Sequence, residues 1–192
     1  MPDHRELYVI AESQGGYFTA AQAREAGFSG ELVSYHARVG RFDRVAHGVF
    51  RLRQFPGSPN EDLFTAQLRA GPESVVSHDS ALALYELSDV LPAEVHLTVP
   101  RSASRRRPGI RQHTRRIAPG EVTVWEGLRV TTVPRTLADI ARSGISDDRV
   151  RQAAQEAVDR GMIGFEDLEV AATRYGGRAA RIFRSYLRQQ SP

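Results

Sequence analysis

The stretch GYFTAAQAREAGFSGELVSYHARVGRFDRVAHGVFRLR, residues 16–53, decides the fold of this 192-residue chain. Thr19 stands before an Ala-rich segment of high helix propensity, which ends at a glycine. Ser29 then stands before a second helical pattern over residues 30–39. Two short apolar runs flank a turn at residues 47–48 and predict a β-hairpin.

A further helix precedes this stretch. Asp3 can cap it, and Leu7, Val9 and Ile10 are predicted to face a core. The resulting order is helix, short helix, Gly-containing turn, helix and hairpin. This order is typical of a winged helix-turn-helix, so we predict such a unit over residues 1–55.

One face of the helix over residues 30–39 is predicted to enter a DNA major groove, which is about 12 Å wide. Its spacing places Leu32, Val39 and either Tyr35 or His36 toward the core. Arginines of the hairpin would contact the DNA backbone. The alternative is a winged helix that docks proteins and has no nucleic-acid role. The predicted DNA-binding residues are Glu31, Ser34, Tyr35, Arg38, Arg41, Arg44, Arg51 and Arg53.

Composition excludes several function classes. The chain has no cysteine, so a disulfide scaffold, a thiol nucleophile and a thiolate metal site are excluded. All 26 Lys+Arg residues are arginine, which excludes a P-loop lysine and a Schiff base. No histidine pattern suits a metal. We therefore expect no enzyme activity, catalytic residue, metal or cofactor, and the absence of an apolar leader or span predicts a cytoplasmic protein.

The near-neutral net charge of +3 conceals two strongly basic segments. Residues 101–116 hold seven arginines and residues 170–192 hold five, and neither segment contains an acid. Arg presents a planar donor fork that suits phosphate, although many charge runs are only solvated surfaces. The predicted secondary patch, for nucleic acid or another partner, comprises Arg101, Arg105, Arg106, Arg107, Arg111, Arg115, Arg116, Arg181, Arg184 and Arg188.

A second unit is predicted over residues 61–192, after the linker-like QFPGSPN. Its pattern is mixed α/β and ends in helices, so the whole chain is predicted to be α+β. Ser77-His78-Asp79-Ser80 is interpreted as a helix cap rather than a catalytic dyad, because adjacent helical residues do not face each other. The predicted elements are a helix at 61–69, strands at 75–76 and 95–99, a hairpin at 122–133 and helices from residues 134, 147 and about 179.

Three blocks of this sequence resemble the AbiEi family of antitoxins. YFTAAQA with RFDRVAHGVFRL resembles the winged domain of that family. SVVSHDSALALYELSD, VHLTVPRSASRRRPGIRQHTRR and GLRVTTVPRTLADIAR resemble the domain that follows it. Together the blocks cover most of residues 5–142.

The resemblance implies a DNA-binding autorepressor that binds its own double-stranded promoter. It also implies that the protein acts as an antitoxin, encoded beside a nucleotidyltransferase toxin with which it need not form a stable complex. Two alternatives stay open. The second unit could neutralise the toxin directly, by binding or phosphotransfer, or RSASRRRPGIRQHTRR could form an RNA-binding module.

Overall fold

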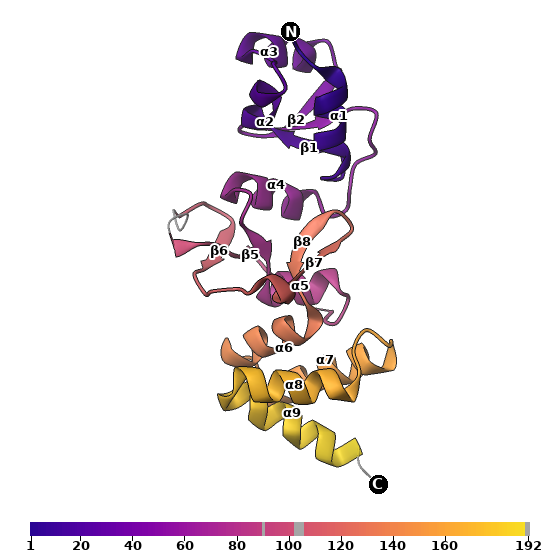
Figure 1. Cartoon of the computed structure of the whole chain (residues 1–192), viewed down its shortest axis with the longest axis vertical. Helices are drawn as coiled ribbons and strands as arrows, with labels where there is room; N and C mark the ends of the chain where they lie inside the picture. The colour runs from indigo at the N-terminus through magenta and orange to yellow at the C-terminus, as the bar shows by residue number, and fades with distance from the viewer. Residues whose placement is uncertain (90, 102–105, 191–192) are drawn as a thin grey trace.

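The computed structural model describes residues 1–89, 91–101 and 106–190. These residues form an elongated stack, with the winged unit at one end, a second sheet in the middle and the C-terminal helices at the other end (Figure 1). The architecture is mixed α+β and opens with a winged helix-turn-helix, which confirms the predicted fold class.

Side-chain caps determine where the helices of the N-terminal unit begin. Asp3, Thr19 and Ser29 each accept hydrogen bonds from backbone N–H groups of the first helical turn. The antiparallel sheet has the strand order β1-β3-β2. The elements are α1 (His4–Glu12), β1 (Tyr17–Thr19), α2 (Ala20–Glu25), α3 (Gly30–Arg38), β2 (Phe42–Ala46) and β3 (Val49–Leu52).

The N-terminal unit departs from the prediction in three places. Strand β1 was not predicted, because three residues are too few to show an alternating pattern. Val9 is 56% exposed, since it lies opposite the Leu7 side of α1 that packs inward. Val39 is 49% exposed because it follows the last helical residue, and Val33 and His36 are the buried residues of α3 instead.

The second unit is built on a mixed sheet with the strand order β6-β5-β4-β8-β7. The central strand β4 pairs antiparallel with β5 and parallel with β8, and the outer strand β6 runs parallel to β5. The elements are α4 (Glu61–Ala70), β4 (Val75–Val76), α5 (His78–Leu84), β5 (Val95–Thr98), β6 (Ile110–His113), the 3-10 turn η2 (Pro119–Glu121), β7 (Val122–Trp125), β8 (Leu128–Thr131), α6 (Val133–Arg142), α7 (Asp147–Asp159), α8 (Phe165–Tyr175) and α9 (Gly177–Gln190).

Each unit has its own hydrophobic core. Leu7, Phe18 and Val33 belong to the first core, whereas the second extends from α4 through the sheet to α9. Tyr17 lies in the winged unit but packs into the second core, where its ring stacks on Phe64 at 4.9 Å. No helix in the described ranges is long and apolar enough to cross a membrane.

Candidate nucleic-acid interface

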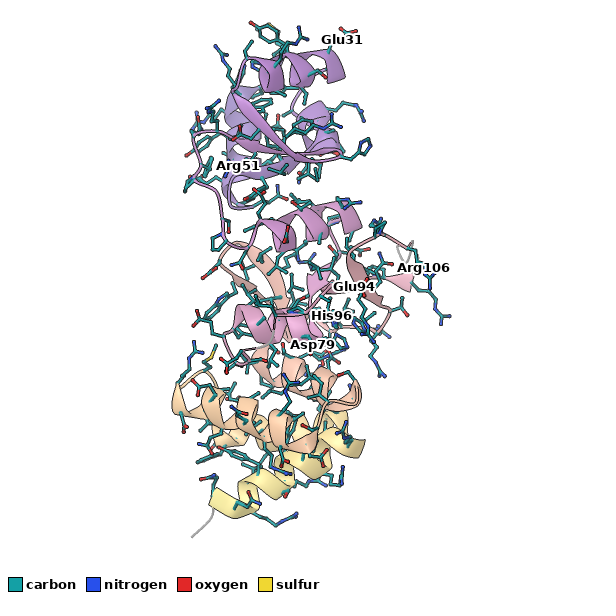
Figure 2. All side chains as sticks on the ribbon, turned by 180° about the vertical axis from the view of Figure 1, so that it is seen from behind. Glu31, Arg51, Asp79, Glu94, His96 and Arg106 are labelled. Carbon is teal, nitrogen blue, oxygen red and sulfur yellow. The ribbon has the colours of Figure 1, made fainter. Side chains whose placement is uncertain are left out.

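The outer face of α3 lies at the free end of the molecule. Figure 1 places α3 at the end opposite α9, and Glu31 lies at this tip in Figure 2. Glu31, Ser34, Tyr35 and Arg38 are all exposed, Tyr35 by 50%. The second unit lies beyond the sheet of the winged unit, so α3 is open to a ligand as large as a duplex.

The buried face of α3 anchors it rigidly. His36 is 4% exposed and its ring packs against Phe42 of β2 at 4.9 Å. Burial, together with the charges of Arg41 and His4, lowers the pKa of His36. A neutral imidazole in this position lets α3 pack on the sheet without an unpaired buried charge.

The open end of the β2–β3 hairpin lies beside the C-terminal end of α3. The backbone N–H of Arg41 donates to His36 O at 2.9 Å, and that of Arg53 donates to Arg41 O at 3.1 Å. Both arginine side chains are exposed, so they extend the polar face of α3. Arg44 is also exposed, with its guanidinium 3.4 Å from His47 Nδ1.

The closed end of the hairpin faces the second unit, whereas arginines of the whole hairpin were predicted to contact the DNA backbone. The turn residues His47 and Gly48 line a cavity shared with the second unit, and Val45 packs against the second core. Arg51 forms an ion pair with Asp43 at 2.9 Å, and its side chain is only 18% exposed. Arg51 is therefore far less available to a phosphate than Arg41 or Arg53.

The first basic segment forms an exposed surface around β6, the outer strand of the second sheet. Arg106, Arg111, Arg115 and Arg116 are exposed, and within the described ranges none of them pairs with a carboxylate. Arg106 projects from the side of the stack in Figure 2. Among the other predicted members, Arg101 is exposed, Arg107 is half-buried and Arg105 lies outside the described residues.

The second basic segment is partly neutralised within the fold. Asp147 pairs with Arg178 at 2.7 Å and with Arg181 at 3.0 Å. Arg184 and Arg188 are exposed on α9, at the opposite end of the molecule from α3 (Figure 1). The structure therefore separates the predicted secondary patch into two surfaces rather than bringing it together.

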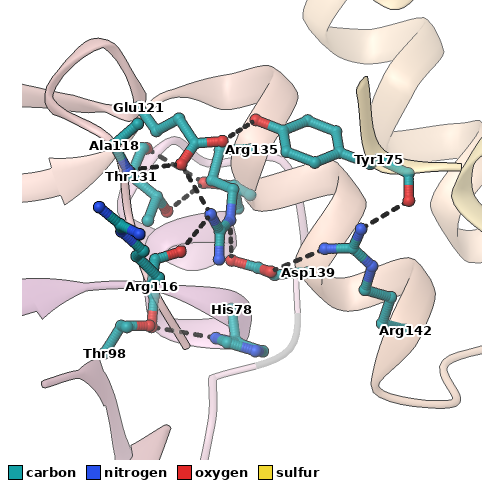
Figure 3. Close-up of polar contacts among 12 residues, drawn as sticks. His78, Thr98, Arg116, Ala118, Glu121, Thr131, Arg135, Asp139, Arg142 and Tyr175 are labelled. Atoms are coloured by element: carbon teal, nitrogen blue, oxygen red, sulfur yellow. Dashed lines mark hydrogen bonds and ion pairs between the residues drawn. The ribbon is translucent and has the colours of Figure 1, made fainter. Parts of the chain in front are cut away.

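A buried ionic cluster, which the sequence analysis did not single out, lies beneath the first basic segment (Figure 3). Arg135 is 4% exposed and donates to Glu121 at 2.9 Å and to Asp139 at 2.8 Å. The Tyr175 hydroxyl donates to the other oxygen of Glu121 at 2.8 Å. Arg135 also donates to the carbonyl of Arg116 at 3.3 Å, so the cluster ties the basic segment to α6 and α8.

The electrostatics of this cluster favour an ionised Glu121. Burial would raise its pKa, but hydrogen bonds from the backbone N–H of Ala118 and from Tyr175, with the charges of Arg135 and Arg174, hold the pKa of Glu121 below its usual value. The spacing of Arg135 and Asp139 at i and i+4 is visible in the sequence. The contact between Arg135 and Glu121 joins residues 14 positions apart, so no local sequence pattern predicts it.

A second polar cluster corrects the predicted cap at the start of α5. Ser77 makes no side-chain capping bond. Its hydroxyl instead contacts His78 Nδ1 at 3.0 Å and accepts from Thr98 at 2.8 Å. Asp79 does not pair with His78; it lies 3.2 Å from His96 Nδ1. These contacts bind α5 to β5, so tertiary partners replace the local capping bonds.

Three histidines converge around this helix start. The rings of His78 and His113 stack at a centroid distance of 3.5 Å, and His96 lies 5.2 Å from His113. Burial, followed by the neighbouring histidines and arginines, lowers the pKa of His78 to about 2 and that of His113 to about 4. Within the described ranges no group of three His, Asp or Glu residues has metal-binding geometry.

Comparison with known proteins bears on the winged unit. Residues 5–53, which contain nearly all of α1 and extend through β3, match a family model described as "Transcriptional regulator, AbiEi antitoxin". This match confirms the resemblance in the part of the chain that carries α3. No curated protein matches the sequence. A crystal structure of the RV2827C protein from Mycobacterium tuberculosis aligns with a TM-score of 0.41 at 14% identity, over 98% of this chain and 81% of that one.

Proposed function

We propose that the protein is a DNA-binding regulator that represses its own promoter and serves as the antitoxin of a two-gene operon. One observation carries the proposal: the polar face of α3 is open at the free end of the molecule. A helix held in this way can read base edges while neighbouring arginines contact phosphates. We infer that the protein acts in the cytoplasm, by binding rather than by catalysis.

Within this interface, we assign the contacts by position. Ser34, Tyr35 and Glu31 face the base edges, and Arg38 contacts a guanine or a phosphate at the end of α3. Arg41, Arg44 and Arg53 contact the backbone from the hairpin. Arg51 is left out of this assignment because Asp43 already holds its guanidinium.

A gel shift with the natural promoter duplex tests the proposal. The double variant Arg38→Ala with Arg44→Ala is expected to lose promoter binding while keeping the melting temperature of the wild type, because both side chains are exposed. A matched control, Arg184→Ala with Arg188→Ala, removes two exposed arginines at the far end. Equal affinity of the wild type and the Arg38/Arg44 variant would refute the assignment.

The toxin is proposed to be a nucleotidyltransferase encoded beside this gene, countered without a stable complex. This part rests on the resemblance alone. Co-expression tests it directly: the wild-type antitoxin should rescue growth from the neighbouring gene product. A pull-down that recovers a stoichiometric complex would instead favour direct neutralisation by binding.

A second nucleic-acid contact is favoured by the uncompensated arginines around β6. Arg106, Arg111, Arg115 and Arg116 lack carboxylate partners among the described residues, and Arg135 fixes the backbone of the last of them. We propose that this surface binds phosphodiester backbone. In a competition experiment at fixed salt, tRNA should displace a scrambled duplex from the wild type. From the variant Arg111→Ala with Arg115→Ala, tRNA should no longer displace it.

A further inference from the structure

The winged unit and the second unit touch along a narrow seam. The Tyr17 ring stacks on Phe64 at 4.9 Å, and the Tyr17 hydroxyl donates to Glu61 at 3.0 Å. Gly15 lies under the same Phe64 ring, where an added Cβ would be 2.7 Å from it. These contacts involve Glu61 and Phe64 in the first turn of α4, which follows the linker.

Beside this seam, the two units line an open cleft with a cavity volume of about 810 Å³. One wall comes from the start of α2 and the hairpin turn, and the other from the end of α4 and the β7–β8 hairpin. A cavity of this size between two units suits a small molecule. Residues that contribute to the walls include Gln14, Ala21, Gln22, Glu25, His47, Leu68, Arg69, Arg107, Val124 and Arg129.

Glutamine side-chain amides hold both walls. Gln14 and Gln22 exchange hydrogen bonds at 3.3 and 3.0 Å on the α2 side. Gln67 donates to the carbonyl of Arg129 at 2.7 Å and accepts from its N–H at 3.2 Å on the other side. The cavity therefore has two preorganised walls.

The charge and polarity of the walls define what the cavity would accept. Arg69 and Arg129 contribute guanidinium groups, that of Arg129 also donating to the carbonyl of Pro72, against the single carboxylate of Glu25. Val124 is 66% exposed and offers an unpacked apolar surface nearby. This combination favours a ligand with an anionic group and an apolar body.

We propose that the cleft between the two units is an effector site for a small organic anion with an apolar body. The anionic group would lie against Arg69 and Arg129, and the body against Leu68 and Val124. Because α2 packs on α3, a ligand that bridges both walls would fix the orientation of α3 relative to the second unit. This coupling rests on the proposed DNA-binding function, whereas ligand binding itself does not.

Fluorescence titration of the full chain with 1-anilinonaphthalene-8-sulfonate, an aromatic sulfonate, tests the site. We expect saturable binding at one site per chain. Ala21→Trp places a large side chain in the cleft and excludes the probe sterically, whereas Arg69→Ala removes an exposed cation and its charge-assisted contact. Each should weaken binding roughly ten-fold. Matched controls are Val170→Trp on α8 and Arg188→Ala on α9, which should leave the affinity within about two-fold.

Circular dichroism and melting temperature establish that each variant is folded. If both folded cleft variants bind the probe as the wild type does, or if binding does not saturate at one site, the proposal is overturned. The Arg38→Ala, Arg44→Ala variant separates this result from the proposed function. This variant should bind the probe with wild-type affinity while losing promoter binding. If the wild type itself did not bind the promoter, the proposed function would be refuted, but the result of the probe titration would be unaffected.

Discussion

At the scale of single residues, Arg135 is a buried cation with two buried acidic partners. It lies between Glu121 and Asp139, and all three groups are almost fully buried. Arg135→Leu would remove the buried cation that both carboxylates share and leave Glu121 with Arg174 and Asp139 with the more distant Arg142. Breaking a buried ion pair costs about 3–5 kcal/mol. We expect urea unfolding to show a loss of that size.

The control for Arg135 is Arg151→Ala. Arg151 pairs with Asp148, whose side chain is 89% exposed, and such surface pairs contribute about 0–1 kcal/mol. The account of the buried cluster fails if both variants unfold at the same urea concentration.

Single residues also show what local sequence can predict. Asp3, Thr19 and Ser29 cap helices as expected, because capping depends on neighbours within a few positions. Ser77 does not, because its hydroxyl contacts Thr98 on another strand. The role of Glu121 could likewise not be predicted from the local sequence, because its side-chain partners lie on α6 and α8.

At the scale of elements, α5, β5 and β6 meet at the histidine cluster, which predicts a pH dependence. The folded-state pKa values of about 2 for His78 and about 4 for His113 lie below the ordinary 6.5. The unfolded chain therefore binds more protons, so stability is greatest above pH 6.5 and falls as the pH drops toward these values. Between pH 7.5 and 5 we expect a loss of about 2–4 kcal/mol in chemical denaturation.

Two variants isolate this effect. His113→Gln should remove part of the loss, because burial also lowers the pKa values of His78, His96 and His36. His47→Gln, at the exposed hairpin turn, is the matched control. Glu121 does not interfere, because its lowered pKa places its titration below pH 4.5. A stability that stays flat from pH 7.5 to 5 would exclude buried neutral histidines.

The elements with regular periodicity were predictable, and the others were not. The pattern Val150, Ala153, Ala154 and Ala157 forms the buried face of α7 as expected. Strand β6 was missed because its IRQH sequence is largely polar, as suits an outer strand. The polar face of α3 followed from helical spacing, but the hairpin turn faces the second unit for reasons of tertiary packing.

At the scale of the whole molecule, Gly15 controls how closely the two units approach. Its φ is +65°, and an added Cβ would lie 2.7 Å from the Phe64 ring. Gly15→Ala should therefore cost more than the roughly 1–2 kcal/mol of left-handed backbone strain. Gly109→Ala is the matched control, because its φ is +75° with nothing within 4 Å. Equal losses of unfolding free energy would show that the seam does not need this close contact.

The central claim is that α3 and the exposed arginines of the hairpin hold promoter DNA at the α3 end of the molecule. The salt dependence of promoter affinity measures the arginine contacts, since each lost phosphate contact lowers the slope of log K against log[salt] by about one. For the Arg38→Ala, Arg44→Ala variant the account predicts a slope smaller by roughly one to two than that of the wild type, with weaker binding. An unchanged slope and affinity would contradict it.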